Sequence, residues 1–188
     1  FNTLANLRVL VATDPPRAQA MLDHLIAYLR ATLSASRATT HPLADEFERL
    51  RDYLELMAVR MGPRLSYQLD LPETLQAVSV PSLLLQPLVE NAIRHGLEPQ
   101  VQGGRISVRA STRPGPVGTL LVLEVHDTGA GLATAPPASD APGSHFGLAQ
   151  VRERLATLYG TTATLDLIAA SAGGTSATVT FPLKSVTP

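Results

Sequence analysis

Three polar side chains interrupt an apolar stretch and are the first candidates for chemistry. Glu90, Asn91 and His95 lie among Leu, Val, Ile and Ala residues between Gln86 and Gly96. A carboxylate beside an amide oxygen suits Mg²⁺, which prefers oxygen ligands and keeps several waters. The same residues also fit a half-buried structural helix in which the Asn is hydrogen-bonded and the Glu faces solvent. This stretch alone leaves both interpretations open.

The spacing of the stretch predicts a helix with polar groups on its inner face. Side chains four, three and four positions apart share one face of a helix, and here they are Leu84, Leu88, Asn91 and His95. A polar group on a core-directed face needs a partner, because burying it unpaired is costly. Gly96 is predicted to end this helix as its C′ residue.

A second motif, Asp127-x-Gly129-x-Gly131, follows an apolar run at Leu121–Val125. The Asp127 carboxylate would repel phosphate, but it would accept a hydrogen bond from a neutral donor such as the exocyclic amine of adenine. The glycines allow the backbone to approach a ligand closely. Asp-Gly patterns are also common in turns, and for this motif alone the turn is the better explanation.

A third motif opens a predicted C-terminal helix. The stretch from Gly143 through Gly147 to Leu148 opens the helix predicted at 146–159, and Arg152 and Arg154 follow about one turn later. Free N–H groups and the positive end of the helix dipole suit phosphate oxygens at such a place. Glycines flank many helices, so this motif is weak by itself.

A fourth motif, Gly173-Gly174-Thr175, separates two predicted strands at 164–168 and 176–181. It fits a hairpin turn, and it equally fits a loop that brings a hydroxyl group to a ligand.

Composition limits the class of protein. The 188 residues are 45% hydrophobic and 16% charged, which predicts a folded core in one domain or one domain with a smaller appendage. A net charge of −1 without a basic run argues against nucleic-acid binding, and the absence of cysteine excludes disulfides and weakly favours a reducing compartment. No apolar run approaches the roughly 20 residues that span a bilayer. Because the chain begins at Phe1, we interpret it as a piece of a longer protein.

Helical periodicity dominates the first third of the chain. Leucines at helical spacing predict two helices, at 1–12 and 15–33, that a turn at Asp14-Pro15-Pro16 joins into a hairpin, with a linker at 34–41. A third helix carries a heptad seam of Leu43, Phe47, Leu50, Leu54, Met57 and Met61, and its charged residues, Glu46 and Arg49 among them, are assigned to the other faces. The seam fits packing in a bundle or across a dimer.

After Gly62-Pro63 the period changes from helical to two, which predicts strands. Alternating or continuous apolar residues predict strands at 65–71, 77–80, 106–110, 121–125, 164–168 and 176–181. A long loop at 132–146 separates the fourth of these strands from the C-terminal helix. The predicted layout is a helical appendage followed by a sheet with helices on one face.

In combination the four motifs are far more specific than each alone. Glu90-Asn91-x-x-x-His95, Asp127-x-Gly129-x-Gly131, Gly143-x-x-x-Gly147-Leu148 and Gly173-Gly174-Thr175 resemble, in order, the N, G1, G2 and G3 boxes of the GHKL ATPase superfamily. The resemblance implies an α+β fold, a two-layer α/β sandwich of the Bergerat type with a mixed sheet and helices on one face. It also implies boundaries: a partial dimerisation and phosphoacceptor hairpin at 1–41, a linker helix at 42–62 and an ATP-binding domain at 63–188.

The helical segments narrow the resemblance to LytS-type sensor histidine kinases. Phe1-Asn2-Thr3-Leu4 is similar to the end of their Asn-Pro-His-Phe-Leu-Phe-Asn signature. The motifs Leu43-x-x-Glu46-Phe47, Tyr53-Leu54 and Arg60 resemble their linker helix. The phosphoacceptor His of that signature would lie three residues before Phe1, and we therefore expect ATP binding by this chain without autophosphorylation.

The resemblance also implies roles for individual residues. Asp127 would bind adenine, with Gly129, Gly131 and, through water, Thr175 beside it. Asn91 would hold Mg²⁺ and Glu90 would act as the base or orienter of the attacking imidazole. The residues implied to contact the rest of ATP are His95, Gly143, Gly147, Leu148 and Arg152.

For the whole protein, the resemblance implies a homodimer formed through the first helices and a membrane anchor upstream in the bacterial inner membrane. The kinase core would be cytoplasmic, and its partner would be a response regulator with a LytTR-type DNA-binding domain, so this chain itself would not bind nucleic acid. Two alternatives remain at this stage. One is a non-catalytic nucleotide-binding and dimerisation module, and the other is a GHKL serine kinase of the anti-sigma-factor type, which the hairpin at 1–33 argues against.

Overall fold

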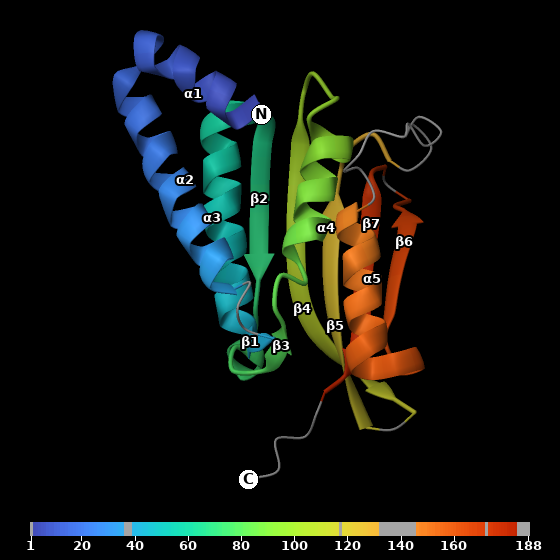
Figure 1. Cartoon of the computed structure of the whole chain (residues 1–188). Coiled ribbons are helices and arrows are strands. Elements are labelled where there is room, and N and C mark those ends of the chain that lie inside the picture. The colour runs from blue at the N-terminus through green and yellow to red at the C-terminus, as the bar shows by residue number, and fades with distance from the viewer. Residues whose placement is uncertain (1, 36–38, 117, 132–145, 172, 184–188) are drawn as a thin grey trace.

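The first helices form the predicted hairpin. The computed structural model describes residues 2–35, 39–116, 118–131, 146–171 and 173–183. Helix α1 (Asn2–Thr13) and helix α2 (Pro15–Ala35) are joined at Asp14, whose Oδ1 accepts a hydrogen bond from the backbone N–H of Arg17 at 3.2 Å. The side chain of Arg17 in turn donates to the carbonyl of Val59, which ties α2 to the next helix (Figure 1).

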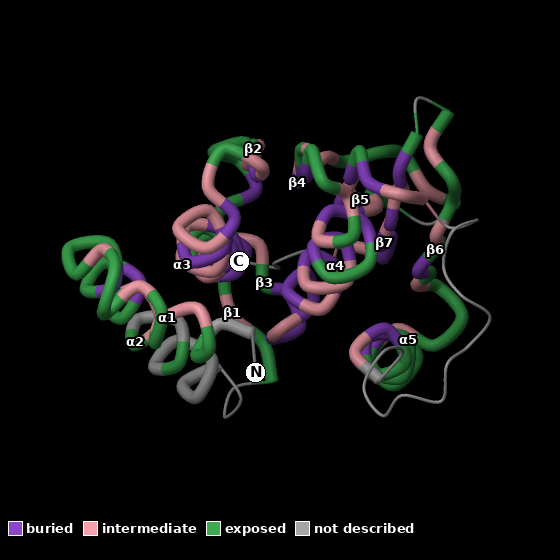
Figure 2. Tube along the Cα trace, turned by 90° about the horizontal axis from the view of Figure 1, so that it is seen from above, coloured by how far each residue is buried: buried purple, intermediate pink, exposed green. Residues whose placement is uncertain are grey.

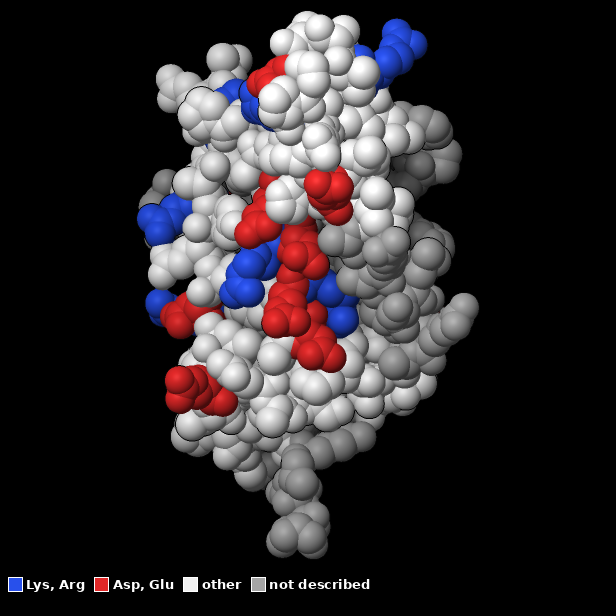
Figure 3. Space-filling model, turned by 90° about the vertical axis from the view of Figure 1, so that its left-hand side faces the viewer, with Lys and Arg blue, Asp and Glu red and all other residues white. Residues whose placement is uncertain are grey.

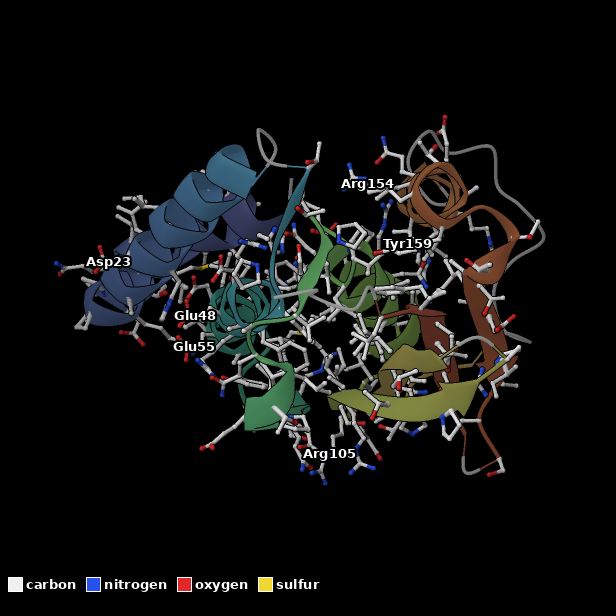
Figure 4. The ribbon with its side chains drawn as sticks, turned by 90° about the horizontal axis from the view of Figure 1, so that it is seen from below. Asp23, Glu48, Glu55, Arg105, Arg154 and Tyr159 are labelled. Carbon is white, nitrogen blue, oxygen red and sulfur yellow. The ribbon has the colours of Figure 1, made fainter. Side chains whose placement is uncertain are left out.

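Helix α3 (Leu43–Met61) buries its heptad seam within this chain. All six seam residues are buried, as predicted. The outer side of α3 is acidic: Glu48 and Glu55 point away from the core in Figure 4, and Figure 3 shows a row of acidic side chains on this side of the molecule. The assignment of Glu46 to an outer face is wrong, since only 1% of this residue is exposed.

A mixed five-stranded sheet forms the second layer. Its strands are β2 (Leu65–Asp70), β4 (Gly104–Gly115), β5 (Gly118–Asp127), β6 (Thr164–Ala169) and β7 (Thr175–Pro182). Their order is β2-β4-β5-β7-β6, with β2 and β4 parallel and the other pairs antiparallel. The predicted α+β class and mixed sheet are confirmed.

Helices cover one face of this sheet. Helix α4 (Gln86–Asn91), the π-helical turn η3 (Ala92–Leu97) and helix α5 (Phe146–Tyr159) lie with α3 on the same side, as Figure 2 shows. Alternate residues of β4, such as Ile106 and Val108, are buried against the helices, while Arg105 and Arg109 are exposed on the other face. The remaining short turns are η1 (Gly62–Arg64), η2 (Glu73–Leu75) and η5 (Gly160–Thr162).

A second, two-stranded sheet lies at the start of α3. Strand β1 (Thr40–Pro42) pairs antiparallel with β3 (Ser79–Pro81), so the predicted linker at 34–41 ends in a strand. Backbone hydrogen bonds from Leu43 to the carbonyl of Val78 and from Ser82 to the carbonyl of Thr39 extend the pairing. This partner lies about forty residues away along the chain, which local periodicity does not reveal.

The central helix differs from its prediction at its C-terminal end. Gly96 does not terminate it, because the π turn runs to Leu97 and closes with a hydrogen bond of 2.9 Å from the Glu98 N–H to the Ile93 carbonyl. A π turn holds more residues than an α turn, so side chains after Asn91 are rotated relative to the α-helical pattern. His95 is exposed rather than buried with Leu84 and Leu88, but it lines the same pocket as Asn91.

None of the described helices combines the length and apolar character needed to cross a membrane. The predicted loop at 132–146 lies almost wholly outside the described residues.

Candidate functional site

A buried carboxylate stands at the end of β5. Asp127 is 3% exposed, and its Oδ1 accepts a hydrogen bond of 2.8 Å from the backbone N–H of Gly129. The backbone N–H of Thr175, its partner in the β5–β7 ladder, also donates to this carboxyl group. Burial raises the pKa of Asp127 above its ordinary value, and these two hydrogen bonds offset only part of that rise. A carboxylate has about four acceptor positions, more than these two donors use.

The surroundings of Asp127 require glycine at close approaches. A Cβ added to Gly96 would lie 2.7 Å from the Asp127 Oδ1, and one added to Gly129 would lie 2.3 Å from the carbonyl carbon of Gly96. The carbonyl of Gly96 also accepts a hydrogen bond of 3.0 Å from the Ala130 N–H. Gly131, with a φ of 75°, continues this turn. The G1 motif and the end of the central helix therefore form one tightly packed unit.

A small pocket of about 90 Å³ lies between α4–η3 and the start of α5. It is lined by Pro87, Glu90, Asn91, Arg94, His95, Gly147 and Leu148. The two helices approach closely here, since a Cβ added to Gly147 would lie 3.1 Å from the Cβ of Pro87. Asp127 does not line this pocket, but it contacts Gly96, the residue next to His95.

The carboxylate of Glu90 is oriented by its own helix. The Gln86 Nε2 donates a hydrogen bond of 2.7 Å to the Glu90 Oε1, and the two residues are one helical turn apart. Gln86 is buried, while Glu90 is partly exposed in the pocket. The geometry presents one carboxylate oxygen of fixed direction beside Asn91.

The predicted Mg²⁺ site offers few protein ligands. Among the described residues, no group of three or more His, Cys, Asp or Glu side chains is arranged to hold a metal ion. Mg²⁺ is usually held by one or two protein oxygens together with waters and substrate phosphates. Asn91 and Glu90 side by side in the pocket fit that smaller donor set.

The other predicted site residues divide into three groups. Gly147 and Leu148 line the pocket with Asn91. Arg152 is exposed on α5 and is not among the residues that line it. Gly143 lies outside the described residues.

Sequence reasoning missed Gln86 and the packing role of Gly96. The four-residue spacing of Gln86 and Glu90 was a signal for their pairing. The contact of Gly96 with Asp127 joins segments thirty-one residues apart, and the sequence carries no local sign of it.

Two family models match the sequence of this chain. Residues 79–185 match the family model described as histidine kinase-, DNA gyrase B-, and HSP90-like ATPase. The chain belongs to this ATPase family. Residues 1–65 separately match the model described as histidine kinase. The two family models together cover most of the chain.

Similar proteins include sensor histidine kinases. The chain is 32% identical over 163 residues to the sensor histidine kinase BtsS of Escherichia coli strain K12, covering 85% of this chain and 28% of BtsS. It is 27% identical over 192 residues to the sensor protein LytS of Staphylococcus epidermidis strain RP62A, covering 98% of this chain and 32% of LytS. The chain thus spans about 30% of the length of these relatives. The resemblance to GHKL ATPases and LytS-type sensor kinases is confirmed.

Solved structures agree on the fold. The histidine kinase domain of the Erythrobacter litoralis EL346 blue-light activated histidine kinase superposes with a TM-score of 0.56 at 21% identity, covering 94% of this chain and 84% of that one. The catalytic domain of the histidine kinase ThkA gives a TM-score of 0.53 at 14% identity, covering 77% and 95%.

Proposed function

We propose that this chain is the ATP-binding kinase core of a two-component sensor histidine kinase. In the whole protein, the γ-phosphoryl group of ATP would pass to a His N-terminal to Phe1 and then to an Asp of a response regulator. The observation that carries the proposal is the buried Asp127 carboxylate packed against Gly96, next to a pocket that contains Glu90 and Asn91.

Asp127 is the proposed adenine-binding group. Its carboxylate is fixed by the N–H groups of Gly129 and Thr175 and would accept a hydrogen bond from the exocyclic amine. A donor that finds a pre-oriented carboxylate in a buried position forms a stronger hydrogen bond than it does with water around it. Gly131 and the Thr175 hydroxyl, the latter through water, would complete this end of the site.

The phosphate end is proposed at the start of α5. Gly147 and Leu148 face the pocket, and the N–H groups and dipole of this helix would stabilise phosphate oxygens. His95 lines the same pocket from the opposite helix. Gly143, from the loop predicted at 132–146, and Arg152 of α5 are proposed to add contacts to phosphate.

Asn91 is proposed to supply an amide oxygen to Mg²⁺. Bound MgATP supplies an activated phosphoryl group whose charge the metal neutralises. Glu90 is proposed to accept the proton of the attacking imidazole or to orient that ring, and Gln86 holds its carboxylate in place for either task.

The helices preceding the sheet are proposed to form the dimer. Residues 1–41 would belong to the dimerisation and phosphoacceptor hairpin, 42–62 to a linker helix and 63–188 to the ATP-binding domain. The hairpin exposes large apolar side chains, which supports a partner surface: Leu4, Val9, Val11, Leu22, Ile26 and Leu29. The parent protein would be anchored in the bacterial inner membrane with this core in the cytoplasm, and its response regulator would be of the LytTR type.

Two measurements test the proposal. Calorimetric titration of the chain with ATP and ADP, each with and without Mg²⁺, should show binding that Mg²⁺ tightens for ATP. A longer protein with the upstream His should acquire acid-labile phosphate from labelled ATP, and replacing that His should abolish the label. A longer protein that binds ATP and never becomes labelled would instead be a non-catalytic nucleotide-binding module.

A further inference from the structure

A buried carboxylate outside the nucleotide site links the linker helix to the site. Glu46 of α3 is 1% exposed, and its Oε1 accepts a hydrogen bond of 2.8 Å from the backbone N–H of Leu85, directly before α4. Its Oε2 accepts from His41 Nε2 at 2.7 Å and from the Arg49 guanidinium at 3.0 Å. A buried carboxylate with these donors is a rigid tie between three segments of the chain.

The Leu85 contact replaces a missing helix cap. Leu85 is the N-cap residue of α4, and its own side chain makes no capping hydrogen bond. Helix N-termini leave backbone N–H groups without intrahelical partners, which side chains from elsewhere can satisfy. The turn before α4 is strained, because Leu83 has a φ of 55° without being glycine. Glu46 therefore fixes the first turn of the helix that carries Glu90 and Asn91 at a point where the chain itself gives little support.

Helix α3 also holds the other end of this helical segment. Arg60 forms an ion pair with Glu98, which follows the π turn. Arg64, just after α3, donates to the carbonyls of Glu98, at 3.2 Å, and of Gln100. The segment with Glu90 and Asn91 is thus attached at both ends to α3 or the turn that follows it.

The same cluster reaches α5. Ser82 Oγ lies 3.1 Å from His41 Nδ1, and the carbonyl of Ser82 accepts a hydrogen bond from Arg154. Figure 4 shows Arg154 on α5, the helix whose first turn contains Gly147 and Leu148. Glu46 therefore lies at the centre of contacts that fix both helices flanking the pocket.

We propose that Glu46 is a positioning residue for the nucleotide site: it sets the place of α4, and through His41 and Ser82 that of α5, relative to the linker helix α3. A displacement of α3 is transmitted to Glu90 and Asn91 by this contact. The expected change in ATP affinity rests on the proposed function. The expected change in amide exchange at Leu85 rests only on the hydrogen bond between Glu46 and the Leu85 N–H.

The experiment compares three substitutions at Glu46. Glu46→Gln keeps an oxygen acceptor for the Leu85 N–H, Glu46→Asp withdraws the carboxylate by one methylene, and Glu46→Ala removes it. Phe181→Leu is the control, because Phe181 is buried near the Pro182 end of β7, where its ring lies 4.8 Å from that of Tyr159 at the C-terminal end of α5, so the substitution should lower stability away from the Leu85 contact. MgATP affinity by calorimetry and amide hydrogen exchange of residues 85–91 are measured at a temperature where each variant is folded.

The expected results distinguish loss of the hydrogen-bond acceptor at Glu46 from a general loss of stability. Glu46→Ala should weaken MgATP and accelerate exchange of the Leu85 amide by about tenfold or more, the effect of losing one hydrogen bond to a charged group. Glu46→Gln should retain most of both, and Phe181→Leu should change neither. A folded Glu46→Ala variant with wild-type affinity and wild-type exchange at Leu85 would overturn the proposal.

Two other outcomes also lead to a decision: Glu46→Ala does not fold, or the wild-type chain does not bind ATP. Should Glu46→Ala fail to fold, Glu46→Asp is compared with Glu46→Gln, and weaker MgATP binding by the Asp variant is expected, whereas affinity equal to that of the Gln variant overturns the proposal. Should the wild-type chain not bind ATP, the proposed function fails, and exchange at Leu85 still reports whether Glu46 holds the start of α4.

Discussion

The contact between Gly96 and Asp127 predicts a selective effect of one added methyl group. In Gly96→Ala the new Cβ would lie 2.7 Å from the Asp127 Oδ1 and 3.0 Å from its Cγ, where ordinary contacts begin at 3.4 Å. The carboxylate must therefore move by about 0.7 Å, or the helix must move away from it by that distance. Because Gly96 has no left-handed φ, the substitution carries no backbone strain of its own.

The effects of Gly96→Ala on the free energy of unfolding and on ATP affinity can be worked out separately. Replacing Gly by Ala within a helix gains about 1 kcal/mol, and overpacking costs about 1–3 kcal/mol, so the net loss of stability should not exceed about 2 kcal/mol. For a domain of this size each 1 kcal/mol lowers Tm by about 2–4 °C. Displacing the carboxylate from adenine should cost roughly 1.5–3 kcal/mol of binding, which is roughly a 10- to 150-fold loss of ATP affinity.

The assay is calorimetric titration with ATP alongside thermal unfolding. Gly160→Ala is the matched control: a Cβ there meets nothing within 4 Å, yet its φ of 58° makes the substitution strained, at about 1–2 kcal/mol. Gly160 lies beyond the C-terminal end of α5, away from the pocket at Gly147. A folded Gly96→Ala protein that binds ATP as tightly as Gly160→Ala does would refute the role assigned to the position of Asp127.

Three further predictions follow from the site and from the Glu46 contacts. Asp127→Asn should weaken ATP at least tenfold while leaving the affinity for inorganic triphosphate within about twofold, and equal losses in the two titrations would contradict the adenine role. Asn91→Ala should remove the Mg²⁺-dependent part of ATP affinity, so a titration that keeps its full dependence on Mg²⁺ would exclude Asn91 as a ligand. Burial alone would raise the pKa of Glu46, but hydrogen bonds from His41, the Leu85 N–H and Arg49 lower it below 4.5. Its ionised form therefore stabilises the fold above pH 4.5, and this contribution disappears as the pH falls through the lowered pKa. The Tm difference between wild type and Glu46→Gln should shrink over that range, and a difference that stays constant with pH would contradict this account.

Periodicity predicted the parts of the fold that depend on one buried face. The heptad seam of α3 and the alternating residues of β4 are buried as expected, because repeated burial of one face leaves its period in the sequence. Glu46 shows the limit of such reasoning. Its charge predicted exposure, whereas donors from β1, which directly precedes α3, and from the start of α4, thirty-nine residues along the chain, make its burial possible.

The motifs predicted the candidate site in part. Asn91 and Gly147 line the same pocket, while Asp127 is attached to it only through Gly96. The π turn that gives Gly96 this role depends on a shift of one residue in the backbone hydrogen bonds, and side-chain pattern contains no sign of such a shift. Strand β1 was missed for a similar reason, since three residues in a polar linker become a strand only when β3 lies beside them.

The π turn at Ala92–Leu97 has a consequence for how this protein can vary in length. Surface loops tolerate insertion and deletion, whereas removing one residue from an ordinary α turn rotates everything after it by about 100°. A π turn holds one residue more than an α turn, so removing one residue here would restore an ordinary α-helix and leave the following segment on nearly the same face. The residue that then meets Asp127 would still have to be glycine, because a Cβ in the place of Gly96 would lie 2.7 Å from the Asp127 Oδ1. The π turn is thus the place in the central helix where a change of one residue in length would least disturb the approach to β5, provided that glycine is kept opposite Asp127.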